Sequence, residues 1–156
     1  MKNFEVCIRG ITKKGNKILI CHSKGGNHYF FPGGHIEFKE SIREAILREF
    51  KEELGVSVKK FTFIGIVENI YEEELTHHEF NLVFEIKVKN SNSKSREDHI
   101  DFFWFDIGKF SKEKVLPIAL QKSILKWLKD KKIFWASQIY NKTILGKIQK
   151  RKTAKR

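Results

Sequence analysis

The sequence predicts an α/β domain in which helices cover the faces of a mixed β-sheet. Three observations lead to this prediction. Apolar segments with partial alternation recur along the chain, as in strands that bury one face. Between residues 40 and 54 the apolar spacing changes to the period of a helix. A second helical pattern follows Pro117, and the 156 residues suit one domain with a sizeable core.

The first two strands are expected to form a hairpin. Residues 4–12 (FEVCIRGIT) are apolar and β-branched, and residues 17–23 (KILICHS) have the same character. The KKGN sequence between them, residues 13–16, contains the Gly and Asn of a turn. Residues 29–34 (YFFPGG) then predict a short strand that ends at Pro32.

The cysteines and the N-terminal sequence indicate a soluble cytoplasmic protein. Cys7 and Cys21 fall in strand-like segments without the spacing of a metal site or a redox pair, so we expect buried free thiols. Glu5 and Arg9 interrupt the N-terminus where a signal peptide has an apolar core. No apolar stretch approaches the ~20 residues that span a bilayer. We therefore expect no contact with membranes.

The segment from Glu40 to Leu54 is expected to be an amphipathic helix. Gly55 follows it as a C-terminal cap. The apolar positions recur at helical spacing and are Ile42, Ala45, Ile46, Phe50 and Leu54.

The second half of the chain predicts three more strands and a second helix. Residues 61–71, 78–88 and 100–107 are rich in β-branched and aromatic residues. A polar loop, NSNSKSRED, precedes the last of these strands. Pro117 suits the first position of a helix. One face of this helix would carry Leu120, Ile124, Trp127 and Leu128.

The C-terminal end of the chain is strongly basic. The net charge is +12, and the last 26 residues hold nine lysines and arginines and no acidic residue. We place the domain at residues 1–132 and a partly disordered basic extension at residues 133–156. Such a tail favours RNA as a second partner, since clustered basic residues gain affinity by releasing counterions. The alternative is a lysine-rich composition without a binding role.

Three glutamates near the end of the first helix pose an electrostatic problem. Glu49, Glu52 and Glu53 repel one another at helical spacing, by about 0.2–0.5 kcal/mol for each pair. They also lie near the helix C-terminus, where anions are unfavourable. Arg48 can pair with only part of this charge. On a helical wheel the glutamates flank the apolar stripe, so they line the edge where helix meets sheet.

Two interpretations of the glutamates remain at this point. One is a solvated acidic surface, which is common on helices. The other is a site for Mg²⁺ or Mn²⁺, whose preferred ligands are carboxylate oxygens. The preceding FFPGGH favours the second, because proline fixes a bend and two glycines allow backbone to approach a ligand closely.

These residues resemble the Nudix box, G-x5-E-x7-R-E-U-x-E-E-x-G-U, in which U is a bulky apolar residue. One departure is Lys39, at an unspecified position where many relatives have glycine. The flanking strand pattern extends the resemblance to roughly residues 4–130. The nine specified positions are occupied by Gly34, Glu40, Arg48, Glu49, Phe50, Glu52, Glu53, Gly55 and Val56.

The resemblance implies a Nudix-like α/β/α sandwich that hydrolyses a nucleoside diphosphate linked to another moiety, with Mg²⁺ as cofactor. Matched by position, Glu49, Glu52 and Glu53 correspond to the metal ligands and general base of the family. Gly34 corresponds to a residue that can offer its carbonyl to a metal. Arg48 corresponds to the residue that orients the glutamates.

Other acidic residues are weaker candidates. Glu40, the first glutamate of the box, is more structural than catalytic in the family. Relatives often use a loop acid outside the box as base or ligand, and Glu97, beside Asp98, is the favoured candidate here. Glu79 and Glu85 on a strand are alternatives.

The substrate-binding residues are harder to identify from sequence. Aromatic rings can stack on a nucleobase, and Lys or His can meet a phosphate, although such aromatic residues more often belong to the core and a loop His is more often merely exposed. The candidates are Lys24, Tyr29, Phe31, His35 and Phe80.

The expected substrate is a small nucleotide, which is a nucleoside di- or triphosphate derivative. ADP-ribose hydrolases of the family often have a proline some fifteen residues beyond the box, and its absence here argues against that subgroup. The alternatives are a protein acting on or binding RNA 5′ ends through the basic tail, and a non-catalytic ligand sensor. Intact box glutamates argue against the sensor.

Overall fold

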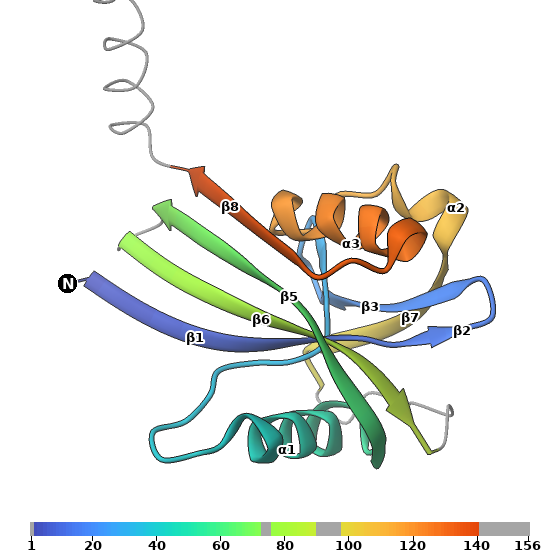
Figure 1. Cartoon of the computed structure of the whole chain (residues 1–156), viewed down its shortest axis with the longest axis horizontal. Coiled ribbons are helices and arrows are strands. Elements are labelled where there is room, and N and C mark those ends of the chain that lie inside the picture. Colours follow the sequence, from blue (N-terminus) through green and yellow to red (C-terminus); the bar gives the residue numbers. More distant parts are fainter. Residues whose placement is uncertain (1, 73–75, 90–97, 141–156) are drawn as a thin grey trace, which may run out of the picture.

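The structure, a computed structural model, describes residues 2–72, 76–89 and 98–140. Two sheets and two long helices form the fold, with α1 on one side of the first sheet and α3 on the other (Figure 1). The elements in chain order are β1 (Lys2–Ile11), β2 (Lys13–Lys14), β3 (Lys17–Ser23), β4 (Tyr29–Phe30), α1 (Ile42–Leu54), β5 (Val58–Glu72), β6 (Thr76–Val88), β7 (Ile100–Asp106), α2 (Ile107–Phe110), α3 (Ile118–Asp130) and β8 (Phe134–Tyr140).

The first sheet is mixed, which confirms the predicted fold class. Its strand order is β1-β6-β5-β8, and β1 and β8 run parallel to their neighbours whereas β5 and β6 are antiparallel. The second sheet has the order β2-β3-β4, with β7 paired to β3. Cys7 and Cys21 are buried free thiols, as expected.

The predicted hairpin between the first two strands is largely wrong. β1 pairs with β6 along its whole length, and only the two residues of β2 pair with β3. Cys7 and Ile8 explain this, because adjacent strand residues point to opposite faces and both are fully buried. The centre of β1 is therefore covered on both faces. A strand in a hairpin with one face toward solvent would be covered on the other face only.

α1 forms as the sequence predicts, and its ends are well defined. Ser41 and Glu44 form a capping box at the start, and Gly55 ends the helix in the left-handed conformation. The hydrogen bond from Ser41 lowers the pKa of the Glu44 carboxyl. The buried face of α1 packs on the first sheet in a cluster that includes Ala45, Ile46, Phe50, Ile8 and Phe84.

α3 begins at Ile118, with Pro117 as its N-cap instead of its first residue. Its buried residues pack against the opposite side of the first sheet, which we call the α3 side. This cluster includes Leu120, Ile124, Trp127, Ile11 and Val83. None of the helices in the described residues has the length and apolar character needed to cross a membrane.

β8 was missed by the sequence analysis, which ended the domain at residue 132. The structure instead extends the first sheet to Tyr140, because residues 134–140 pair with β5. Every second residue of this edge strand is exposed, so its apolar pattern is weak; Trp135 is 72% exposed. Residues 141–156 lie outside the described residues.

Lys39 adopts a backbone conformation that costs stability. Its φ is +68°, in the left-handed region that disfavours side chains with a Cβ. We expect Lys39→Gly to raise the free energy of unfolding by roughly 0.5–1 kcal/mol. Lys126→Gly, at an exposed helical position, is the matched control and should lower it by about 1 kcal/mol. Chemical denaturation measures both, and a destabilised Lys39→Gly variant would contradict this explanation.

Candidate active site

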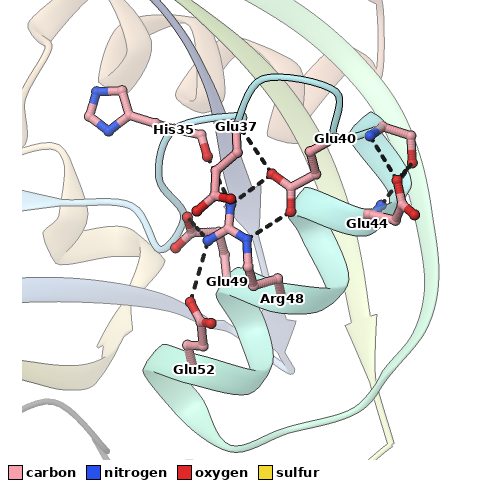
Figure 2. A network of polar contacts seen from close by, with 8 residues as sticks. His35, Glu37, Glu40, Glu44, Arg48, Glu49 and Glu52 are labelled. Atoms are coloured by element: carbon pink, nitrogen blue, oxygen red, sulfur yellow. Dashed lines mark hydrogen bonds and ion pairs between the residues drawn. The ribbon is translucent and has the colours of Figure 1, made fainter.

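Arg48 is the centre of the polar network on α1 (Figure 2). Its Nε and Nη2 donate to the two carboxylate oxygens of Glu40 at 2.7 and 2.8 Å. Its Nη1 donates to Glu49 at 2.7 Å and to Glu52 at 3.3 Å, and Nη2 also donates to the carbonyl of His35 at 3.0 Å. One guanidinium thus fixes three carboxylates and the loop that precedes the helix.

The paired charges shift the ionisation of both partners. The hydrogen bond from Arg48 holds the pKa of the Glu40 carboxyl at about 2, and a backbone hydrogen bond at Glu37 adds to this. The hydrogen bond to Glu40 contributes most to raising the pKa of the Arg48 guanidinium, and Glu49 raises it further. The pair of Glu40 and Arg48 is therefore charged at neutral pH. Both carboxylate oxygens of Glu40 are bonded to Arg48, which agrees with a structural contribution of this residue.

The loop before α1 lies along the free edge of β1. Backbone hydrogen bonds join Ile8 N to Gly34 O at 2.9 Å, Gly10 N to Pro32 O at 2.8 Å and Ile36 N to Val6 O at 2.8 Å. These bonds attach residues 32–36 to the sheet as an extra, short strand-like segment. They carry the two glycines to the place where α1 approaches the sheet.

Glu49 lies against the backbone of Gly34. A Cβ at position 34 would come within 2.5 Å of Glu49 Oε1, so a larger residue there would displace this carboxylate from its position. The Gly34 carbonyl accepts from Ile8 N, and a carbonyl oxygen has a second lone pair for a further partner. A hard anionic oxygen therefore lies against the residue whose carbonyl can accept a further partner.

Glu53 is the most buried of the three glutamates. Its side chain accepts from Gly33 N at 3.0 Å, and the residue is only 4% exposed. Gly33 has a φ of +127°, and a Cβ there would strike the carbonyl oxygen of Ile8. Glu52 differs from both other glutamates, because its side chain is 57% exposed.

A polar group on the α3 side of the first sheet was not singled out from the sequence. Arg9 on β1 donates from Nε to Asn81 Oδ1 at 2.9 Å and from Nη1 to the carbonyl of Gly33 at 3.0 Å. Glu79, one of the weaker acid candidates, accepts from Asn69 Nδ2 at 3.2 Å and, at 3.5 Å, from Asn81 Nδ2. The available signal was an arginine within the apolar half of β1, residues 6–11, where the structure leaves it half-buried.

The donor set fits a hard divalent cation. The carboxylates of Glu53 and Glu49 lie against the two glycines, and Arg48 joins Glu52 to Glu49; oxygen ligands of this kind suit Mg²⁺ or Mn²⁺. No group of three or more His, Cys, Asp and Glu side chains within residues 2–72, 76–89 and 98–140 is already arranged around one point as a metal site. Binding would therefore require Glu52 or Glu49 to exchange part of its contact with Arg48.

The structure does not bring all predicted substrate residues to this site. Phe31 is fully buried and packs against Phe110, so it serves the core and is not available to stack on a base. Tyr29 also packs against the core, close to Phe105. Phe80 contacts Phe4 and lies, by strand alternation, on the side of the sheet that α1 covers.

The remaining predicted residues have mixed positions. His35 is exposed, and its Nε2 lies 3.3 Å from Glu5 Oε2, next to the glycine loop. Lys24 is exposed after β3, with its backbone N–H bonded to His99. Glu97 lies outside the described residues, as does the basic segment from Lys142 onward.

Comparison with known proteins tests the resemblance to the Nudix family. The family model described as NUDIX domain matches residues 1–128. An ADP-ribose pyrophosphatase of Methanocaldococcus jannaschii is 28% identical over 125 residues, which are 78% of this chain and 73% of that protein. An 8-oxo-dGTP diphosphatase of Proteus vulgaris is 30% identical over 97 residues, covering 60% and 87% of the two chains.

The fold agrees with solved structures as well. The MutT protein from Bacillus halodurans matches with a TM-score of 0.74 at 19% identity, covering 89% of this chain and 92% of that chain. The box residues, the mixed sheet and the family match over most of the chain lead to one conclusion. The chain belongs to the Nudix family of hydrolases, which act on pyrophosphate bonds.

Proposed function

We propose that this protein is a Mg²⁺-dependent pyrophosphohydrolase of a small nucleoside di- or triphosphate derivative, with Mn²⁺ as a substitute ion. One observation carries the proposal. The carboxylates of Glu49 and Glu53 lie against the Gly34 and Gly33 backbone, and Arg48 holds Glu49 and Glu52 beside them. This concentration of negative charge is unfavourable for a stable helix end unless it has a cationic ligand.

Glu49, Glu52 and Glu53 would hold the cation, with the carbonyl of Gly34 as a further ligand. When bound, Mg²⁺ supplies an acidic water near neutral pH and neutralises charge on phosphate oxygens. Without such a charge reversal the same carboxylates would repel a pyrophosphate. Hydrolysis adds the oxygen of water to one phosphorus and breaks the phosphoanhydride P–O bond, whose electron pair leaves with the departing phosphate.

The three glutamates differ in what they can do. Glu53 is buried and held by Gly33 N, so it stays in place as a fixed ligand. Glu52 is the most exposed and has the longest contact with Arg48, at 3.3 Å. We assign Glu52 as the general base that accepts the proton of the attacking water, because its carboxylate can give up its contact with Arg48 at the least cost in free energy. Arg48 then keeps Glu49 oriented through its 2.7 Å contact.

Two relatives indicate which nucleotides to test. Their names point to ADP-ribose in one case and 8-oxo-dGTP in the other. The missing proline argues against ADP-ribose as the substrate, but the name of the M. jannaschii relative is a reason to include ADP-ribose in the test. The RNA alternative rests on basic residues outside the described part of the chain, so no contact observed in the structure supports it.

A nucleotide panel tests the proposal directly. Purified protein is incubated with common nucleoside triphosphates, 8-oxo-dGTP and ADP-ribose, in Mg²⁺ and in EDTA, and the products are separated by chromatography. We expect a nucleoside monophosphate product for at least one substrate, only in Mg²⁺. The Glu52→Gln variant should lose about 10²–10⁴-fold in rate as the base is removed. Turnover in EDTA, or turnover unaffected by Glu52→Gln, would contradict the proposal.

A further inference from the structure

Gly33 is held from both faces of the first sheet by charged side chains. Its neighbours Pro32 and Gly34 direct their carbonyls to β1, where Gly10 N and Ile8 N donate to them. The N–H and C=O of Gly33 receive side-chain partners instead. Glu53 approaches from α1 and accepts from Gly33 N, and Arg9 donates to Gly33 O from the α3 side.

The bond from Arg9 holds the carbonyl of Gly33, which the bonds from β1 to Pro32 and Gly34 leave to a side chain. Gly33 O belongs to the peptide that joins two glycines, the residues with the largest backbone freedom. Rotation about the Cα–C bond of Gly33 would move this carbonyl and Gly34, whose backbone Glu49 approaches, relative to Gly33 N, which donates to Glu53. Arg9 therefore restrains the two points against which the carboxylates rest.

Asn81 holds Arg9 in place at the other end of its guanidinium. Asn81 is fully buried, and its Nδ2 donates to Val67 O at 3.4 Å and lies 3.5 Å from Glu79 Oε2. These contacts turn Oδ1 of Asn81 toward Arg9 Nε, at 2.9 Å. The planar fork of arginine can bridge Asn81 and Gly33 at once, whereas a lysine ammonium presents a single nitrogen.

We propose that Arg9 is a positioning residue that sets Glu49 and Glu53 for the divalent cation by fixing the Gly33–Gly34 peptide. The inference rests on the proposed function, since it concerns the same cation. It requires that Arg9 acts through geometry. By charge alone Arg9 would oppose a cation bound at Glu53, since Arg9 and Glu53 both contact the backbone of Gly33, each at 3.0 Å.

If Arg9 acts as a positioning residue, its removal should weaken cation binding. If it acts only through its positive charge, its removal should strengthen cation binding, so the cation affinity distinguishes the two roles. Affinity for Mn²⁺ is measured on the substrate-free full chain, from the electron paramagnetic resonance signal of unbound Mn²⁺. For Arg9→Met we expect about 10-fold or greater weakening, the range found when residues that orient metal ligands are lost. Arg9→Lys keeps the charge but not the bridge and should show a smaller loss. Arg43 is an exposed arginine on α1, so the Arg43→Met variant is the matched control and should bind Mn²⁺ as the wild type does.

The outcomes are distinguishable. Unchanged or tighter Mn²⁺ binding by Arg9→Met would overturn the positioning role, since charge removal alone predicts tighter binding. Full affinity in Arg9→Lys would do the same, because it would show that the two-armed bridge is dispensable. A wild-type protein that does not bind Mn²⁺ would instead overturn the proposed function. A cooperative thermal transition is required of each variant, and Arg9→Lys carries the test should Arg9→Met not fold.

Discussion

Replacing Glu53 with glutamine is expected to reduce Mg²⁺-dependent turnover by about 10²–10⁴-fold without loss of the fold. Glutamine keeps the shape of the side chain, and its Oε1 can still accept from Gly33 N, which the Glu53 carboxylate now does at 3.0 Å. The substitution removes the negative charge and replaces one acceptor oxygen with an NH₂ group. Because the residue is buried among like charges, we expect the free energy of unfolding of the metal-free protein to stay constant or rise.

The matched control is Glu44→Gln on the same helix. Glu44 belongs to the capping box at the N-terminus of α1, and glutamine can occupy the same position in such a box. Its turnover should equal that of the wild type. Steady-state rates at saturating Mg²⁺, together with thermal unfolding, measure both variants. An active Glu53→Gln enzyme would remove Glu53 from the set of metal ligands.

Gly33→Ala is expected to destabilise the protein by at least about 2 kcal/mol. At a φ of +127° the backbone strain alone is of order 1–3 kcal/mol for a residue with a side chain. The new Cβ would also meet Ile8 O and come within 2.9 Å of Ile8 Cδ1, at the edge where the loop pairs with β1. The loop can relieve this contact only by moving, and it would then take Gly33 N away from Glu53.

Gly15→Ala separates backbone strain from steric contact. Gly15 also has a positive φ, +58°, but a Cβ there would meet nothing within 4 Å. It should cost about 1 kcal/mol. Urea denaturation of the two variants and the wild type gives both differences. Equal costs at the two positions would show that the close approach of Gly33 to β1 is unimportant for stability.

The parts of the fold that sequence predicts well are those specified locally. The apolar residues at helical spacing and Gly55 predict α1 and its end, whereas the helix starts at Ile42, after the Ser41 cap, and not at the predicted Glu40. The box glutamates could likewise be placed at one edge, because their positions on the helical wheel are fixed by their spacing. Arg48 was expected to pair with only part of the charge of these glutamates. It contacts Glu49 and Glu52 among them, and it also contacts Glu40.

The parts that sequence did not predict depend on distant partners. β1 could pair with β3 or with β6, and burial on both faces decides this only when the whole sheet is assembled. β8 has exposed alternate residues, so its pattern did not resemble a buried strand. Arg9 and Asn81 are 72 residues apart, and nothing in their local sequence connects them to each other or to Gly33.

Anomalous diffraction from crystals soaked in Mn²⁺ would test the central claim most directly, that the glutamates at the end of α1 and the glycine loop bind a divalent cation. We expect an anomalous peak bounded by the carboxylates of Glu49, Glu52 and Glu53, with the Gly34 carbonyl next to it. The same crystals with no peak there, and with Glu49 and Glu52 still bonded to Arg48, would contradict the account.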